Sequence, residues 1–478
     1  MTSIAHPSGR NTPTIQTYLI VSAVATTNQP TNQPSNQPAI QPTMQLIEGA
    51  PSLSVVCLLG QTTDKVLQTI RLFPFPRAAT AESPPREAAA ASRPDPEQQP
   101  AIRAVLLGIV SVPVLMLLAI DAEDGILQTH QIATKYGYRT EVHRVETHDG
   151  FVVEMHRLSA SPMTGEYDSD KPPVFIMHGL LGSSADWILI GPQNALPYLL
   201  SDRGYDVWLG NARGNRYSRK HSYLSIETKD YWDFSWHEIG IYDVPVMIDH
   251  ILHIRGVNRL HYIGHSQGTT AFLVMTSLKP EFNEKVIKLH ALAPAAYLYY
   301  LNNPLMRYLA THLQTATAVV NILGVNQVMP AAPFFNHLAN LFCPNNRDSC
   351  VHTMFLLSAA GASIKQFIHF GQMVQSGHFR QFDYGSSNNS QIYQSFEPPD
   401  YNLTYVRAPV AIYYGSNDQL THPIDVRRLA QELPNLVILK QFPYNHMDFL
   451  LAADAKDVLY EHILASIETD SLFANTTI

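Results

Sequence analysis

The sequence contains little cysteine and no excess of basic charge. Lys and Arg number 32 against 40 Asp and Glu, the formal net charge is −8, and the basic residues form no long run. Such a chain lacks the electrostatic footprint of a nucleic-acid-binding protein, so we predict no nucleic-acid partner. With 45% apolar and 15% charged residues, the composition is typical of a globular protein, and most of the chain should fold.

The three cysteines are Cys57, Cys343 and Cys350, and only the last two share a segment. In an oxidising compartment Cys343 and Cys350 would close a short disulfide loop, whereas two unpaired buried thiols fit the spacing equally well. No second pair of Cys or His stands at ligand spacing from them, which argues against a zinc site. We expect neither a metal nor a cofactor.

Residues 1–103 differ from the rest. They carry the tandem stretch TNQPTNQPSNQPAIQP at 27–42 and a Pro- and Ala-rich stretch at 82–100. This composition offers too little apolar surface to offset the entropy of ordering, so we predict a disordered leader.

The run AVLLGIVSVPVLMLLAI at 104–120 follows Arg103 and carries no charge. Its length lies between the hydrophobic region of a signal peptide and a minimal membrane span. We interpret it as a signal sequence if the natural chain starts near Arg103, or as a signal anchor that holds the protein at a membrane if the leader is retained. A buried core helix is the alternative, but no amphipathic stripe accompanies the run.

The signal interpretations send the remaining chain into the secretory route, as a secreted or lysosomal protein or as a single-pass membrane-anchored one. Three Asn-x-Ser/Thr triplets, at Asn388, Asn402 and Asn475, are candidate glycosylation sites. They agree with a luminal or extracellular location.

Strand and helix patterns alternate between residues 121 and 470. The stretch EVHRVETHDGFVVEMHRL reads as a hairpin turning at Asp149-Gly150. Six further strands are predicted at PVFIMHG, YDVWLGN, RLHYIGH, VIKLHALAPA, PVAIYYGSND and LVILKQF. Several are near-continuous apolar runs, which indicates an α/β fold whose mostly parallel sheet is covered by helices on both faces.

A long insertion interrupts this alternation at about 297–405. It holds over a hundred residues rich in Leu, Phe, Tyr, Met and Asn and shows no clear strand. An insertion of this size is too long for a loop in a compact domain. We predict a mainly helical cap over the carboxyl edge of the sheet.

The stretch LHYIGHSQGTTAF at 260–272 places Ser266 between a predicted strand and a predicted helix. Gly264 and Gly268 flank it, as in the sharp turn that exposes a nucleophilic serine. The glycines allow close chain approach, and the hydroxyl lies near the positive end of the following helix.

A serine hydroxyl needs a base and a carboxylate that orients the base. Asp418 and His446 each follow a predicted strand, and the order Ser266, Asp418, His446 is the one described for α/β hydrolases. Four residues compete for these roles and are assigned elsewhere by position: His265, His422, Asp425 and Asp448.

Backbone donors for an oxyanion are predicted at two places. The N–H of Gln267, directly after the serine, supplies one. Leu180, in the loop HGLLGSSADW after an earlier strand, is our choice for the second.

From about residue 123 to 464 the chain resembles the acid lipase family of α/β hydrolases. The matching stretches are HDGFVVEMHRL, HGLLGSSADW, WLGNARGNRYSRKH, DFSWHEIGIYDVP, GHSQG and YNHMDFL. The resemblance implies the α/β-hydrolase fold with a cap or lid, and places Ser266, Asp418 and His446 on the family's triad and Leu180 and Gln267 on its oxyanion hole.

The resemblance also implies hydrolysis of long-chain fatty-acid esters, chiefly acylglycerols and steryl esters, without a cofactor. Cys343 and Cys350 stand where related lipases have cysteines in the cap, whereas the long leader departs from the family pattern. We therefore predict a serine lipase that acts at a lipid–water interface, with no obligate protein partner. A general short-chain carboxylesterase and a non-catalytic lipid carrier remain as alternatives, although a carrier needs none of the three triad residues.

Overall fold

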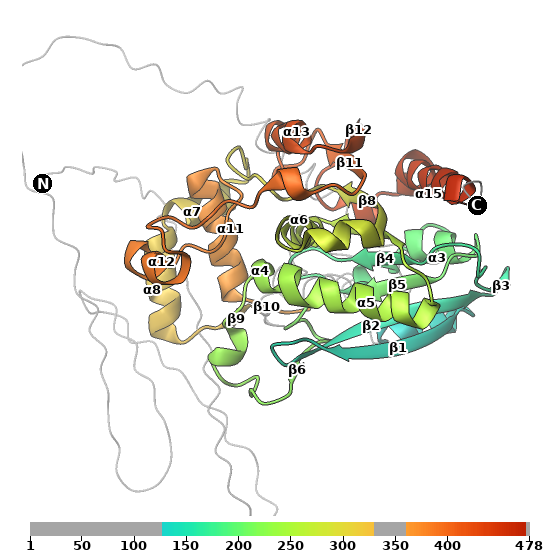
Figure 1. Cartoon of the computed structure of the whole chain (residues 1–478), viewed down its shortest axis with the longest axis horizontal. Coiled ribbons are helices and arrows are strands. Elements are labelled where there is room, and N and C mark those ends of the chain that lie inside the picture. The colour runs from blue at the N-terminus through green and yellow to red at the C-terminus, as the bar shows by residue number, and fades with distance from the viewer. Residues whose placement is uncertain (1–126, 329–359, 475–478) are drawn as a thin grey trace, which may run out of the picture. The chain divides into compact units, whose positions relative to one another are not determined.

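The computed structural model describes residues 127–328 and 360–474, which lie within one compact unit, Pro94–Ile478. Its centre is a ten-stranded sheet whose main path runs β1-β2-β5-β4-β7-β8-β11-β12 (Figure 1). The strands of this path are β1 (Arg139–Glu146), β2 (Phe151–Ser161), β4 (Val174–Met177), β5 (Val207–Gly210), β7 (Leu260–His265), β8 (Val286–Leu292), β11 (Val410–Gly415) and β12 (Leu436–Phe442). All eight coincide with strands predicted from the sequence.

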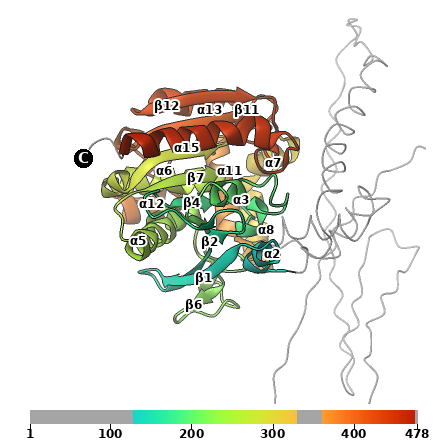
Figure 2. The ribbon, with the colours of Figure 1, turned by 90° about the vertical axis from the view of Figure 1, so that its right-hand side faces the viewer.

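The pairing pattern is mostly parallel, as predicted. β1 and β2 form the antiparallel hairpin at the entry, β2 pairs antiparallel with β5, and the strands from β5 to β12 pair in parallel. Figure 2 shows the sheet from β1 low in the view to β12 at the top. Two short strands, β3 (Gly165–Glu166) and β6 (Lys220–His221), add to β2 and were not predicted, because two residues give no readable pattern.

The central strands β4 and β5 are apolar throughout and buried on both faces, because helices cover the two sides of the sheet there. Along β4, Phe175 and Met177 join one core cluster, while Val174 and Ile176 join the other. The first cluster includes residues of α5 (Val244–Arg255), α6 (Gln267–Leu278) and α13 (Pro423–Glu432). The second includes residues of α2 (Thr129–Lys135), α3 (Leu196–Ser201) and α15 (Glu461–Ala474).

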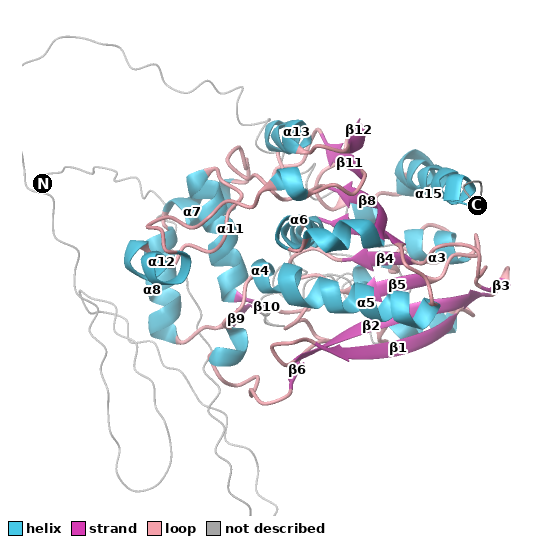
Figure 3. Ribbon diagram, in the orientation of Figure 1, coloured by secondary structure: helices cyan, strands magenta, loops and turns pink. Residues whose placement is uncertain are grey.

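The described part of the insertion after β8 is mainly helical, as predicted (Figure 3). Its described helices are α7 (Pro304–Thr311), α8 (Leu313–Leu323), α11 (Ile364–Ser376) and α12 (Ser386–Tyr393), with α11 packed against α7 and α8. Two short strands, β9 (Gln327–Val328) and β10 (Ala362–Ser363), pair antiparallel within it. The N–H of Asn302 donates to the carbonyl of Gln419, so the insertion begins beside the loop that follows β11.

Strand order decides which loops meet. β4 lies between β5 and β7, and Met177 at its end is in register with Gly264 of β7. The chain therefore reverses its direction of travel across the sheet at β4, which is where open α/β sheets place their sites. At the far side, Gly415 of β11 is in register with Phe442 of β12, so the loops after these strands also start together.

Candidate active site

Ser266 forms a sharp turn between a strand and a helix. β7 ends at His265 and α6 begins at Gln267, so one residue joins the two elements. Its φ of 51° lies in the left-handed region, where a serine is strained unless the surrounding structure holds it. The Ser266 N–H donates to the carbonyl of Leu292 on β8 at 3.0 Å, which ties the turn to the sheet.

Two glycines make this turn sterically accessible. A Cβ on Gly264 would lie 2.9 Å from the carbonyl carbon of Gly268, and one on Gly268 would lie 2.5 Å from the carbonyl oxygen of Met177. A side chain at either position would push the start of α6 away from β7 or β4. The structure thus gives a steric reason for both glycines of the predicted turn.

Asp418 and His446 come together from the ends of β11 and β12. His446 Nδ1 lies 2.8 Å from Asp418 Oδ2, and the carboxylate accepts while the imidazole N–H donates. Asp418 also accepts from the N–H groups of Leu420 and Thr421 and from the Thr421 hydroxyl. These contacts hold a carboxylate that is 2% exposed in one orientation.

The charge of Asp418 is stabilised where it is buried. Burial by itself opposes ionisation, but the adjacent His446 and the bonds from Thr421 outweigh it and hold the pKa of Asp418 below its ordinary value. The side chain is therefore a carboxylate at neutral pH. A charged acceptor on Nδ1 leaves Nε2 of His446 as the nitrogen free to take up a proton.

His265 joins the serine turn to the loop of His446. Its Nε2–H donates to the backbone carbonyl of His446 at 2.9 Å, and the two rings lie 4.9 Å apart between centroids. Burial, with a smaller contribution from His446, lowers the pKa of His265 to about 3, so the ring is neutral. Within the described residues no hydrogen bond joins the Ser266 hydroxyl to the His446 ring. The link between the serine turn and His446 is the hydrogen bond from His265, the residue before Ser266.

The loop after β4 closes the other side of Ser266. A Cβ on Gly179 would lie 3.2 Å from the Ser266 Cβ, which places Gly179, directly before Leu180, against the serine. Leu181 has a φ of 63°, an uncommon conformation for a residue other than glycine. Gln267 opens α6, so its N–H is one of the amides that a helix leaves without an internal acceptor.

The sequence matches two family descriptions, the "partial alpha/beta-hydrolase lipase region" over residues 129–191 and the "alpha/beta hydrolase fold" over residues 172–453. It is 42% identical to Lipase 3 of Drosophila melanogaster over 334 residues, covering 65% of this chain and 84% of that protein. The chain belongs to the acid lipase family of α/β hydrolases. By that membership it is a carboxylic ester hydrolase.

Mammalian members of the acid lipase family align over similar lengths. Human gastric triacylglycerol lipase is 34% identical over 365 residues, covering 71% of this chain and 90% of that protein. Human lipase member K is 37% identical over 322 residues, covering 62% of this chain and 80% of that protein.

The residues that competed with the predicted triad have other contacts in this lipase. His422 is the N-cap of α13, where its Nδ1 accepts from the N–H of Ile424. Asp425 accepts from the N–H of Tyr300, and Asp448 from the N–H of Asn445. None of these three contacts His446 through a hydrogen bond within the described chain.

One site residue of this lipase was not singled out from the sequence. His178 follows β4 directly, and its Nε2 accepts from the N–H of Ala212 at 3.1 Å. Its Nδ1–H then donates to the carbonyl of Gly179 at 2.7 Å, and burial lowers its pKa to about 4. His178 thus anchors the start of the loop that faces Ser266. The only sequence signal was its place in the HGLLG stretch.

Two predicted glycosylation sites of this lipase are exposed. Asn388 lies on α12, and Asn402 precedes the short 3-10 helix Leu403–Tyr405. Asn475, Cys343, Cys350 and residues 1–103 and 104–120 lie outside the described residues. In the ranges 127–328 and 360–474, no helix is long and apolar enough to cross a membrane, and no group of three His, Cys, Asp or Glu side chains is arranged to hold a metal ion.

Proposed function

We propose that this chain is a serine lipase that cleaves fatty-acyl esters of neutral lipids, acylglycerols and steryl esters, at a lipid–water interface. The observation that carries the proposal is the contact of buried Asp418 with His446, joined at 2.8 Å, with His446 held against the residue that precedes Ser266. A carboxylate, an imidazole and a strained serine turn at one sheet edge form the set that acyl transfer requires.

In the proposed reaction, Ser266 Oγ attacks the ester carbonyl while His446 Nε2 takes up its proton. Asp418 stabilises the imidazolium that forms, and the imidazolium returns the proton to the departing alcohol. Water activated by His446 then releases the fatty acid from the acyl-enzyme. The absence of a Ser266–His446 bond is compatible with these roles, because catalytic hydrogen bonds are often loose before substrate binds.

The N–H groups of Leu180 and Gln267 are the proposed donors to the oxyanion. Two observations support them: Gly179, directly before Leu180, lies against Ser266, and Gln267 directly follows the serine at the start of α6. Each such donor typically stabilises the transition state by about 3 kcal/mol.

A lipid substrate is supported by the surface of the cap. Large apolar side chains are exposed on α7 and α8, namely Met306, Tyr308, Leu309, Val319, Ile322 and Leu323. Apolar groups gathered on one pair of helices favour contact with lipid. The relationship to gastric triacylglycerol lipase points to the same substrate class.

We further propose that the catalytic part reaches the secretory route, as a secreted or lysosomal enzyme, or remains anchored through residues 104–120. The exposed Asn388 and Asn402 support glycosylation at those sites. A disulfide between Cys343 and Cys350 belongs to the same proposal.

The test of the catalytic assignment is Ser266→Ala. Hydrolysis of emulsified long-chain triacylglycerol should fall to background, while a thermal unfolding scan shows the protein still folded. Full turnover by this variant would overturn the assignment.

A comparison of substrates tests the lipid class. The wild-type enzyme should hydrolyse emulsified long-chain triacylglycerol with a higher kcat/KM than soluble p-nitrophenyl butyrate. The reverse order would favour a short-chain carboxylesterase. No hydrolysis of either ester would favour a lipid carrier.

A further inference from the structure

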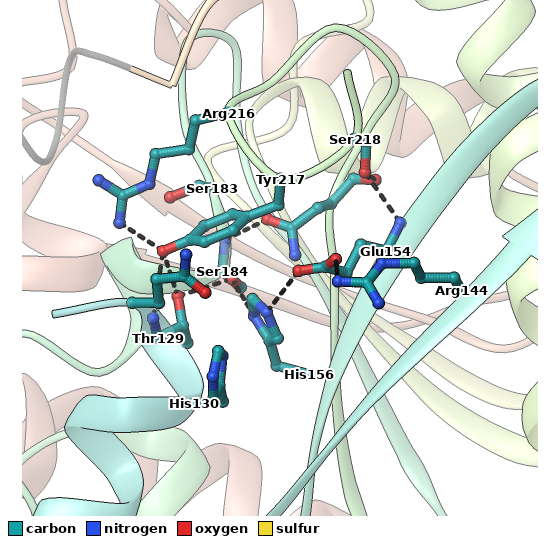
Figure 4. A network of polar contacts seen from close by, with 12 residues as sticks. Thr129, His130, Arg144, Glu154, His156, Ser183, Ser184, Arg216, Tyr217 and Ser218 are labelled. Carbon is teal, nitrogen blue, oxygen red and sulfur yellow. Dashed lines mark hydrogen bonds and ion pairs between the residues drawn. The ribbon is translucent and has the colours of Figure 1, made fainter. Parts of the chain in front are cut away.

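A second serine–histidine–carboxylate arrangement lies away from Ser266 (Figure 4). Ser184 Oγ lies 2.8 Å from His156 Nδ1, and His156 Nε2 lies 3.0 Å from Glu154 Oε1. Arg144 pairs with the second oxygen of Glu154 at 2.7 Å. Ser184 and His156 are 0% exposed, so no substrate reaches this hydroxyl and the arrangement does not serve as a second catalytic centre.

The protons of this arrangement have a fixed order. The Glu154 carboxylate only accepts, so His156 Nε2–H donates to it. Burial lowers the pKa of His156, although Glu154 opposes the shift, so the ring is neutral and its bare Nδ1 accepts from the Ser184 hydroxyl. The Ser184 oxygen also lies 2.9 Å from the hydroxyl oxygen of Thr129 on α2.

Further contacts make the position of Ser184 rigid. Its backbone N–H donates to Asn211 Oδ1 at 3.0 Å. Thr129 Oγ1 lies 2.9 Å from the hydroxyl of Tyr217, which also contacts Arg216. Figure 4 shows these groups converging on Ser184 from β2, from α2 and from the loop that follows β5. A buried network of hydrogen bonds of this kind favours one arrangement of the backbone.

Ser184 stands where the loop facing the nucleophile ends. That loop leaves β4 at His178, passes Gly179, Leu180 and Leu181, and enters the short 3-10 helix Ser184–Trp187. The positive φ of Leu181 is a strained conformation, and such strain persists only when both sides of the segment are held. His178 holds one side, and Ser184 holds the other.

We propose that Ser184, locked by His156, Glu154 and Thr129, is a positioning residue that fixes the Leu180 N–H toward the oxyanion. This role rests on the proposed serine lipase function, because it has meaning only if Leu180 donates to a tetrahedral intermediate. Ser184 itself never touches the substrate. Its effect reaches the reaction through the strained backbone at Leu181.

The first experiment compares wild-type enzyme with Ser184→Ala on soluble p-nitrophenyl butyrate. Loss of an oxyanion donor lowers kcat by about 10²–10³-fold, so a displaced donor should lower it by at least about tenfold. KM should stay within about twofold, because the donor acts on the charge that develops in the transition state. An alkyl boronic acid, which forms a tetrahedral adduct on the serine, should lose affinity in parallel with kcat. A fatty alcohol, which binds as a ground-state ligand, should not.

Ser161→Ala is the matched control. Ser161 is a buried serine of β2 whose hydroxyl donates to Asp202. It lies beyond the part of β2 that pairs with β5. Its removal should lower the thermal midpoint about as much as Ser184→Ala does and leave kcat within about twofold of wild type.

A second variant, Thr129→Val, removes the hydroxyl behind Ser184 and should lower kcat in the same direction. The double variant should lose less than the product of the two single effects, because both act through one contact. A kcat for Ser184→Ala within twofold of wild type would reject the positioning role. An equal loss of affinity for the boronic acid and for the fatty alcohol would also reject it. If the wild-type enzyme itself hydrolysed no ester, the proposed function would fail and the positioning role with it.

Discussion

At the scale of single residues, the surroundings of Asp418 give its carboxyl group a different pKa from that of a nearby aspartate. It is buried and accepts four hydrogen bonds, one of them from His446. Asp425 lies on the next helix, accepts from Tyr300, and has a pKa that burial raises. An aspartate carboxyl is therefore more easily ionised at position 418 and less easily ionised at position 425.

Replacing Asp418 by Asn should lower kcat on the order of 10⁴-fold. The amide N–H₂ facing His446 would favour the tautomer that carries its proton on Nε2, which cannot accept from Ser266. Steady-state hydrolysis of p-nitrophenyl butyrate measures the loss. Asp425→Asn is the control and should retain kcat within about threefold. Equal losses in the two variants would remove Asp418 from the orienting role.

At the scale of elements, the close approach of β4, β7 and α6 shapes the site. The register of Met177 with Gly264 brings the loops after these strands together, and α6 starts against the end of β4. His178 and Ser184 then hold the β4 loop at its two ends. The site depends on backbone-to-backbone contacts that a methyl group would disturb.

Gly268→Ala should therefore destabilise the fold by about 3 kcal/mol, at the upper end for an overpacked interior. The added Cβ would lie 2.5 Å from the carbonyl oxygen of Met177, a backbone atom that cannot move aside by rotation. Gly165→Ala is the control, since its φ is +79° with nothing within 4 Å of an added Cβ, and strain alone costs about 1 kcal/mol. Urea denaturation measures both, and equal losses would contradict the steric argument.

At the scale of the whole molecule, buried neutral histidines link stability to pH. Burial lowers the pKa of His178 to about 4 and those of His261 and His265 to about 3. In the unfolded chain histidine titrates near 6.5, so below that pH the unfolded state binds protons that the folded state does not. Burial also raises the pKa of Asp186 to about 8. Its effect on the pH dependence of stability has the opposite sign and cancels the contribution of one histidine.

We expect the free energy of unfolding to fall as the pH is lowered from about 6.5 to 4. Each such histidine contributes a slope of about 1.4 kcal/mol per pH unit in that window. His261→Phe removes one of them, and neither ring nitrogen of His261 has a hydrogen-bond partner within the described chain. Urea denaturation across this range should give the variant a slope smaller by about 1.4 kcal/mol per unit, and an unchanged slope would contradict the assignment.

The sequence by itself determined the strands of the main sheet, the helical insertion and the residues of the proposed triad. These follow from local patterns, because an apolar run, two glycines around Ser266 and an acid or imidazole just past a strand are all readable within a few residues. The assignment of the competing His422, Asp425 and Asp448 to other roles also followed from their places relative to strand ends.

Only the tertiary structure decided which of these segments meet. The contact of His265 with the His446 carbonyl depends on strand order, and the enclosure of Ser184 by His156 and Thr129 joins three segments far apart in the chain. Local patterning carries no information on such neighbours, because the order of strands in a sheet is fixed by packing across the whole core.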